Sequence, residues 1–303
     1  MTGLDGFTYV NFGDNDAVKA VNNETGEVTD AVWMCVPVGS RVYTPDSLNA
    51  RNAYLKQAED NKLRRTPSNQ RFFMVPHNTD FSDLLPATLT RLIFLNTFVD
   101  ANNRLMLTER KPMQKKDLAD VLGISQTAVK KFWNEVCPKY MTECDDGLIL
   151  TAPEIFIRRK LARHGTYIPY EKFFVTGIRK LYKATDKANH KHLGYIFQML
   201  PFINLQYNIL CHNPEETDLD KIDSMSLSDF CSAIGYDVSN LSRLLSTYRK
   251  LKFDVNGKPE RFCACVYDGL DLKSAQMFVN PHILYNGHNL EKVRILGAFC
   301  SEK

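Results

Sequence analysis

Two segments of the 303-residue chain carry polar side chains at helical spacing, beginning three or four residues after a glycine. The set after Gly123 comprises Gln126, Thr127, Lys130, Lys131 and Asn134. The set after Gly235 comprises Ser239, Asn240, Ser242, Arg243 and Ser246. Such groups on one helix face can hydrogen bond to the edges of DNA bases, since Gln suits adenine and Arg or Lys suits guanine. The chemistry that they offer is recognition of a nucleic acid.

Basic residues outside these sets could contact phosphate groups. Residues 158–191 carry many more positive than negative side chains, whereas residues 1–60 lean acidic, so the net charge of +3 is unevenly distributed. Positive charge that is clustered in this way can follow a phosphate backbone and add affinity without sequence preference. The residues predicted to make such contacts are Arg158, Arg159, Lys160, Lys258 and Arg261.

Other clusters of reactive side chains carry less weight. His190 and His192 have the one-residue gap found in metal-dependent nickases, but Lys191 stands between them and the segment leads into a predicted helix. Cys263 and Cys265 would need a second pair of ligands to hold zinc. The chain has neither a glycine-rich phosphate loop nor a nucleophile elbow. We therefore expect no enzymatic activity, no metal and no cofactor.

The first polar set requires a helix-turn-helix to position it. This motif needs a small residue in its first helix, a glycine in the turn and an apolar residue that faces the core from its second helix. Ala119, Gly123 and Val129 have these roles at the expected intervals. Ser125 is a good N-cap for the second helix. Residues 114–132 thus predict a helix-turn-helix.

The second polar set lies in a weaker copy of the same motif. Here Cys231 is the small residue, Gly235 the turn and Leu241 the core residue. Asp237 can cap the second helix, and Ser226 can cap the first. Residues 226–244 therefore predict a second helix-turn-helix.

These motifs lie within a larger repeat. Residues 71–75 and 172–175 predict a basic-aromatic strand in each copy, followed by a long apolar helix. The apolar stripe of that helix is predicted to contain Leu85, Leu89, Leu92, Ile93 and Phe98 in one copy and Leu193, Ile196, Phe197, Leu200 and Ile203 in the other. Pro201 is expected to kink or divide the second of these helices. A β-hairpin then follows each helix-turn-helix. Its strands are predicted around 140–143 and 148–151, and around 252–255 and 262–267. A proline-containing apolar strand closes each copy, at 152–157 and 280–285.

The composition, 44% hydrophobic and 24% charged, is typical of a folded globular protein. We predict an α+β, mainly helical fold with two tandem winged helix-turn-helix domains and a small N-terminal β-hairpin region around residues 22–26. The predicted divisions are an N-terminal hairpin and connector (1–65), a first winged-helix domain (66–165), a second (166–290) and a C-terminal tail (291–303).

The layout around Ala119, Gly123 and Val129 and around Cys231, Gly235 and Leu241 resembles the replication initiators of bacterial plasmids and phages. Residues 278–287 also look like the asparagine-proline strand that ends winged-helix replication and regulatory proteins from Gram-positive bacteria and their phages. The resemblance covers roughly residues 70–290. It implies binding of repeated DNA sites, with the two recognition helices in successive major grooves roughly 34 Å apart.

The sequence thus favours sequence-specific binding of double-stranded DNA by a replication-initiator-like or transcriptional regulatory protein. The alternative is a protein-interaction factor of a phage or mobile element, an inhibitor of a host or defence protein, on the same scaffold. Other candidate partners are replication and transcription proteins and a second copy of the chain. No apolar run approaches the roughly 18 residues of a membrane helix, and no signal peptide begins the chain, so we expect a cytoplasmic protein that does not contact membranes.

Overall fold

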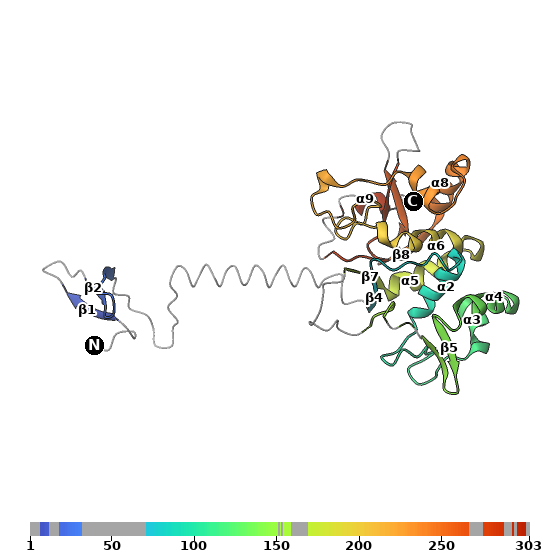
Figure 1. Ribbon diagram of the computed structural model, residues 1–303, viewed down its shortest axis with the longest axis horizontal. Coiled ribbons are helices and arrows are strands. Elements are labelled where there is room, and N and C mark those ends of the chain that lie inside the picture. The colour runs from blue at the N-terminus through green and yellow to red at the C-terminus, as the bar shows by residue number, and fades with distance from the viewer. Residues whose placement is uncertain are drawn as a thin grey trace. The chain divides into compact units, whose positions relative to one another are not determined.

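The computed structural model is an α+β structure of several helices and small sheets (Figure 1). It divides into two compact units, a first unit of residues 1–59 and a second unit of residues 60–303. The residues that it describes are 7–11, 18–31, 71–150, 152, 154–158, 169–266, 275–287, 293 and 296–300.

The first unit contains a three-stranded antiparallel sheet. Its strands are β1 (Phe7–Asn11), β2 (Val18–Asn22) and β3 (Val28–Ala31), in the order β1-β2-β3. Gly26 turns the chain between β2 and β3 with a φ of 69°, and the Asn22 side chain accepts a hydrogen bond from the Glu24 amide at 2.9 Å. The predicted hairpin is therefore present, and β1 extends it on the far side of β2.

Two strands from the two copies of the repeat pair at the centre of the second unit. β4 (Phe72–Pro76) and β7 (Tyr170–Phe174) are antiparallel, and Phe73 faces Phe173 with the rings stacked at 5.3 Å. Ile157 bridges to β4, and Leu284 bridges to β7. Each closing segment thus contributes a single bridge to this small sheet, in place of the strand predicted for it.

Helix packing joins the same two copies. α2 (Pro86–Asn96) crosses α6 (His190–Gln198) closely enough that a Cβ at Gly194 would overlap the Pro86 carbonyl. α5 (Val175–Ala184), a helix that the sequence analysis did not predict, packs beside them and stacks Tyr182 on Phe94 at 3.8 Å.

Both long helices are shorter than predicted. Leu85 is 63% exposed because it is the N-cap of α2, and Phe98 lies beyond the end of that helix. α6 ends before Pro201, which lies in the short 3-10 helix η3 (Leu200–Phe202). Proline has no amide hydrogen for the helical bond, so the helix is divided here, which is one of the two outcomes predicted for Pro201.

The first helix-turn-helix candidate begins with η1 (Lys115–Asp117) and α3 (Leu118–Leu122). α4 (Gln126–Val136) follows, and then a hairpin of β5 (Met141–Cys144) and β6 (Gly147–Leu150). We call residues 115–150 the first helix–hairpin segment. The Leu105 amide donates to the Leu148 carbonyl at 2.9 Å, so the chain before η1 lies against β6.

The second copy has the same order of parts. α7 (Leu227–Ala233), the short 3-10 helix η5 (Val238–Asn240) and α8 (Leu241–Lys250) precede a hairpin of β8 (Lys252–Val255) and β9 (Lys258–Arg261). We call residues 227–261 the second helix–hairpin segment. Nearby lie two further 3-10 helices, a second strand pair and a short helix: η2 (Lys187–Asn189), η4 (Leu219–Lys221), β10 (Cys263–Val266), β11 (Gln276–Val279) and α9 (Leu296–Phe299).

The second hairpin differs from the prediction in its returning strand, which is β9 and not residues 262–267. Asn256 and Gly257 both have positive φ, 52° and 82°. This two-residue turn pairs Val255 with Lys258, so β9 begins at the first residue after the turn. Residues 263–266 form β10, which pairs with β11.

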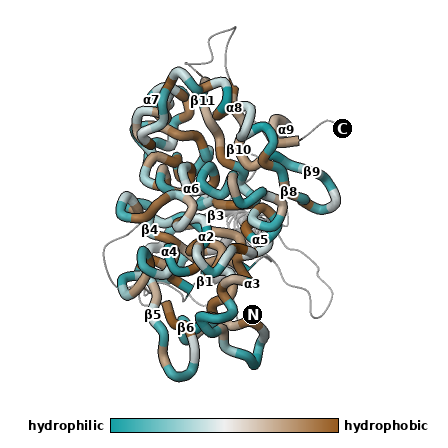
Figure 2. The backbone as a smooth tube through the Cα atoms, turned by 90° about the vertical axis from the view of Figure 1, so that its right-hand side faces the viewer, coloured by the Kyte–Doolittle hydropathy of each residue, from teal (hydrophilic) through white to brown (hydrophobic). Residues whose placement is uncertain are grey.

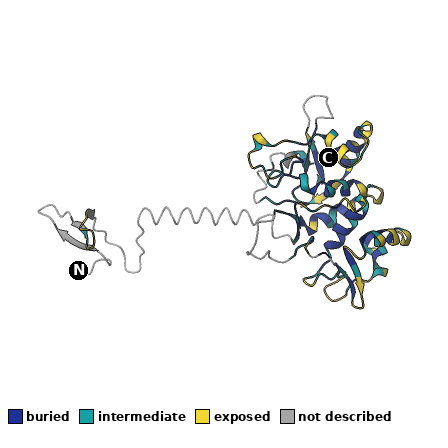
Figure 3. Cartoon of the chain, in the orientation of Figure 1, coloured by how far each residue is buried: buried dark blue, intermediate teal, exposed yellow. Residues whose placement is uncertain are grey.

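One continuous apolar core runs through the second unit and holds both helix–hairpin segments together (Figure 3). It includes Phe73, Leu92, Phe132, Phe197 and Leu244, all with at most 2% of their surface exposed. In the described part of the chain, no helix is both long and apolar enough to cross a membrane.

Candidate nucleic-acid interface

Local capping fixes the turn before α4. Gly123 ends α3 with a φ of 63°, a left-handed conformation that glycine adopts without steric cost. Ser125 then starts α4, and its hydroxyl accepts a hydrogen bond from the Ala128 amide at 3.3 Å. These contacts set the direction of α4, as the sequence predicted.

α4 is sharply two-sided. Val129, Phe132 and Val136 are buried in the core. The opposite face is fully exposed and carries all five predicted residues: Gln126, Thr127, Lys130, Lys131 and Asn134. None of these side chains has a hydrogen bond or ion pair with another residue of the described chain. They are therefore available to an external partner.

The second turn is built in the same way but enters its helix differently. Ser226 and Asp229 form a capping box at the start of α7, and Gly235 has a φ of 65°. The Asp237 carboxylate accepts from the Ser239 amide at 2.9 Å and caps η5, so the first polar residues lie in a 3-10 turn before α8. The Asn240 side chain donates to Asp237 at 3.3 Å, which engages one of its hydrogen-bonding groups within the protein.

The exposed face of α8 lies opposite its buried residues, Leu241, Leu244, Leu245 and Tyr248. Ser242 and Arg243 are exposed, as are Ser239 and Asn240 in η5. The Arg243 guanidinium has no hydrogen-bond partner among the described residues. A free guanidinium can bind guanine or phosphate through two parallel hydrogen bonds.

The two helices lie on one side of the second unit. α4 and α8 both lie at the right in Figure 1, and Figure 2 looks onto that side with both helices in view. The hydrophobic core joins their inner faces, which keeps the two helices in a fixed relation.

Lysines that the site prediction omitted lie between these helices. Lys187 is close to the first turn, because a Cβ at Gly123 would lie 3.6 Å from its Cε. Lys191 and Arg243 both lie near His192, whose pKa is lowered by burial and then by these two positive charges. Lys187 and Lys191 are exposed. They belong to the basic run of the sequence, but only the tertiary structure puts them beside both helix–hairpin segments.

Two tyrosine hydrogen bonds hold this intervening region in place. Tyr182 of α5 donates to the Leu122 carbonyl at the end of α3, at 2.9 Å. Tyr248 of α8 donates to the His192 carbonyl in α6, at 3.0 Å. The segment with Lys187 and Lys191 is thus attached to both neighbours.

A buried polar network anchors the second hairpin. The Asn280 amide donates to the Glu260 carboxylate and to the Arg261 carbonyl, both at 2.9 Å, and His282 contacts Glu260 at 3.0 Å. Burial raises the pKa of Glu260, but the hydrogen bonds from His282 and Asn280 outweigh this, so its pKa lies below the ordinary value. The asparagine-proline segment therefore positions the hairpin, in which Lys258 is exposed and Arg261 is half-buried.

The remaining predicted phosphate contacts lie elsewhere. Arg158 is half-buried with its guanidinium 5.4 Å from the centre of the Phe73 ring, beside the central strand pair. It does not belong to the exposed faces of α4 and α8. Arg159 and Lys160 lie outside the described residues.

His190, His192 and Cys263 are buried, and Cys265 is half-buried. Burial lowers the pKa of His190 and of His192 and raises the pKa of Cys265 to about 12 and that of Cys263 above its usual range. The imidazoles are thus neutral and the thiols protonated at pH 7. Within the described ranges, no three His, Cys, Asp or Glu side chains are grouped to hold a metal ion.

No protein-family model, curated protein or solved structure matches this chain.

Proposed function

We propose that the two helix–hairpin segments are winged helix-turn-helix units that bind double-stranded DNA with sequence specificity, in a replication-initiator-like or transcriptional regulatory protein. α4 and α8 are the recognition helices, and β5–β6 and β8–β9 are the wings. The observation that carries this proposal is that α4 and α8 lie on the same side of the second unit and carry exposed polar side chains that have no partner among the described residues.

The exposed side chains would make two kinds of contact, with bases and with phosphate groups. Gln126 and Asn134 suit adenine, and Arg243 suits guanine, so these residues would discriminate between bases. Lys130, Lys131, Lys187, Lys191 and Lys258 would contact phosphate groups and add affinity without preference. The lysines between the helices would follow the DNA backbone from one groove to the next.

Selection of duplexes from a random pool by the full chain tests the proposal. An enriched motif with two half-sites is the expected result. Binding to it should weaken as salt is added, and in a plot of log Kd against the logarithm of the salt concentration the slope should be about 0.9 for each phosphate contact. A pool without enrichment, or a nearly flat salt dependence together with a stable complex with another protein, would favour the protein-interaction alternative.

Alanine variants locate the interface. Arg243→Ala should weaken binding to the selected duplex by about 1–3 kcal/mol, roughly 5- to 150-fold, and should relax preference at one base pair. The double variant Lys130→Ala/Lys131→Ala should weaken all duplexes similarly and reduce the salt slope. Arg110→Ala, which removes an exposed charge from the loop before η1, is the matched control and should bind like the wild type.

A further inference from the structure

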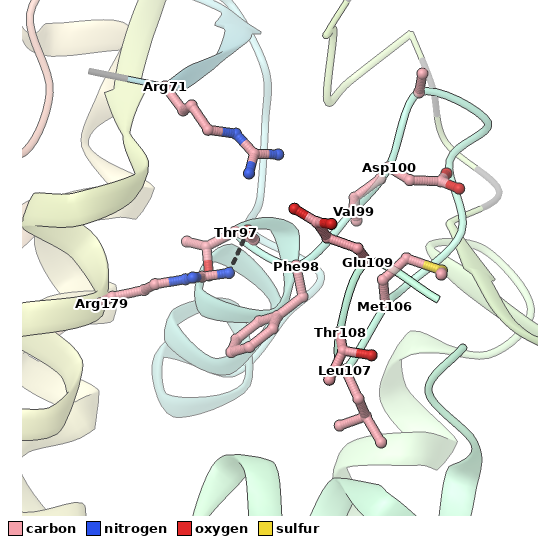
Figure 4. Close-up of a pocket in the computed structure, with 11 residues that line it drawn as sticks. Arg71, Thr97, Phe98, Val99, Asp100, Met106, Leu107, Thr108, Glu109 and Arg179 are labelled. Carbon is pink, nitrogen blue, oxygen red and sulfur yellow. Dashed lines mark hydrogen bonds between the residues drawn. The ribbon is translucent and has the colours of Figure 1, made fainter. Parts of the chain in front are cut away.

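A pocket of about 480 Å³ opens in the second unit, where the loop after α2 meets α5 and the residue before β4 (Figure 4). Its volume lies in the range of small-molecule sites. Arg71 and Arg179 line it on one side. The apolar part of its wall is formed by Phe98, Val99, Met106 and Leu107.

The two arginines of the pocket differ in freedom. Arg179 is fixed, because its Nε and Nη2 donate to the hydroxyl and carbonyl of Thr97 at 2.9 and 2.7 Å and its guanidinium lies 4.2 Å from the centre of the Phe98 ring. Arg71 is exposed, and its side chain has no hydrogen bond or ion pair with any residue that the structure describes. A fixed guanidinium and a free one on the same side of the pocket can both donate hydrogen bonds to one ligand.

A third guanidinium lies beside them. Nε and Nη2 of Arg158 are buried without a hydrogen-bond partner in the described chain. Burial, followed by the charges of Arg71 and Arg179, lowers the pKa of Arg158 to about 10. Buried donors normally find a partner, and like charges repel. An anion in the pocket would relieve the repulsion among the three guanidinium groups.

The carboxylates nearby do not balance this charge. Asp100 accepts hydrogen bonds from the Asn102 and Arg104 amides at 2.8 and 2.9 Å, pairs with the Arg104 side chain at 3.5 Å, and points away from Arg71 in Figure 4. Glu109 points toward Arg71 but is exposed. Among the described residues, the guanidinium groups of Arg71, Arg104, Arg158 and Arg179 are opposed by the carboxylates of Asp100 and Glu109, which leaves two positive charges in excess. A phosphate dianion supplies the missing charge.

We propose that this pocket binds a small phosphomonoester. Arg71 and Arg179, which line the pocket, would hold the phosphate, for which the guanidinium fork is well shaped. Arg158 would add positive charge from beside them, and the organic part would lie against Phe98 and Leu107. β4, where the pocket begins, lies at the left of the second unit in Figure 1, whereas α4 and α8 lie at the right. The site is thus separate from the proposed DNA interface and does not depend on that proposal.

Calorimetric titration of the full chain with adenosine 5′-monophosphate, adenosine and inorganic phosphate tests the site. The monophosphate should bind, adenosine should bind at least about tenfold more weakly, and phosphate should compete. Arg71→Gln should weaken monophosphate binding about tenfold. Arg110→Gln, an exposed neighbour outside the pocket lining, is the matched control and should leave it unchanged.

Glu109→Gln should change the affinity for the monophosphate in the opposite direction from Arg71→Gln. It removes the carboxylate that competes for Arg71 and keeps all four guanidinium groups, so affinity for the monophosphate should increase. Equal binding of adenosine and its monophosphate, no binding at millimolar concentration, or an Arg71→Gln variant that binds like the wild type would each overturn the proposal. Displacement of the monophosphate by duplex DNA, with weaker duplex binding by Arg71→Gln, would assign the site to the DNA backbone instead.

Discussion

At the scale of single residues, Glu171 is a carboxyl group that folding removes completely from water. It lies in β7 with none of its surface exposed, and neither carboxyl oxygen has a well-formed hydrogen bond within the described chain. Burial raises the pKa of Glu171 well above its ordinary value, opposed by the charge of Lys172 and the backbone of Asn286. At a pH just above 4.5, the Glu171 carboxyl group is therefore protonated in the folded protein and mostly ionised in the unfolded chain.

The sign of this linkage gives a prediction. Because the pKa of Glu171 is raised in the folded state, the contribution of this residue to folding stability is fully present below about pH 4.5. That contribution is lost as the pH rises through the folded-state pKa. Glu171→Gln keeps the shape without the titration, so it should stabilise the protein by about 1 kcal/mol or more at pH 8 and by less at pH 5. Urea denaturation at both pH values measures this difference. Glu143→Gln, at an exposed strand position, is the control, and an equal effect of the two substitutions would contradict the prediction.

At the scale of elements, the crossing of α2 and α6 determines how the two helix–hairpin segments are joined. Gly194 permits this crossing because its Cβ position is occupied by the Pro86 carbonyl. The Thr90 hydroxyl, one turn further along α2, donates to the His190 carbonyl at 2.8 Å. Each contact ends on a backbone carbonyl, which cannot move aside as a flexible side chain could.

Gly194→Ala should therefore separate the two helices. We expect a loss of about 1–3 kcal/mol or more, the usual cost of overpacking where backbone must move, even though alanine favours the helical state. Thermal unfolding monitored by circular dichroism measures it. Lys191→Ala, an exposed position on the same helix, should change stability by less than about 0.5 kcal/mol. If the Gly194 variant melted at the wild-type temperature, the crossing would be looser than described.

At the scale of the whole molecule, three buried histidines contact distant segments of the second unit. The His77 ring contacts the Ile203 carbonyl at 2.7 Å, the His190 ring lies 4.2 Å from the Tyr182 ring at a tilt of 37°, and the His192 ring meets Tyr248 of α8 edge to face. Burial is the main cause that lowers the pKa of each of these three below the ordinary 6.5. At a pH slightly below 6.5 the three rings are therefore mostly neutral in the folded protein and mostly protonated in the unfolded chain.

Folding stability should accordingly fall as the pH drops below about 6.5 and level off below the folded-state pKa values. His77→Gln should reduce the difference in melting temperature between pH 7.5 and pH 5.5. His212→Gln, at an exposed position, should leave that difference unchanged. An unaltered pH profile in the His77 variant would mean that this ring titrates normally.

The sequence by itself determined the local parts. The turns at Gly123 and Gly235, the cap at Ser125 and the outward positions of α4 follow from signals that act within three or four residues. The turn at Asn256-Gly257 contained enough information to place β9, but the prediction started the returning strand four residues too late.

Tertiary structure decided how distant residues meet. The pairing of β4 with β7, the α2–α6 crossing, the lysines between α4 and α8 and the cluster of Arg71, Arg158 and Arg179 join residues roughly 20 to 120 positions apart. Such contacts depend on the shapes of buried surfaces that only the folded chain creates. A linear pattern therefore assigned Arg158 to an exposed basic run, whereas packing places it half-buried over Phe73.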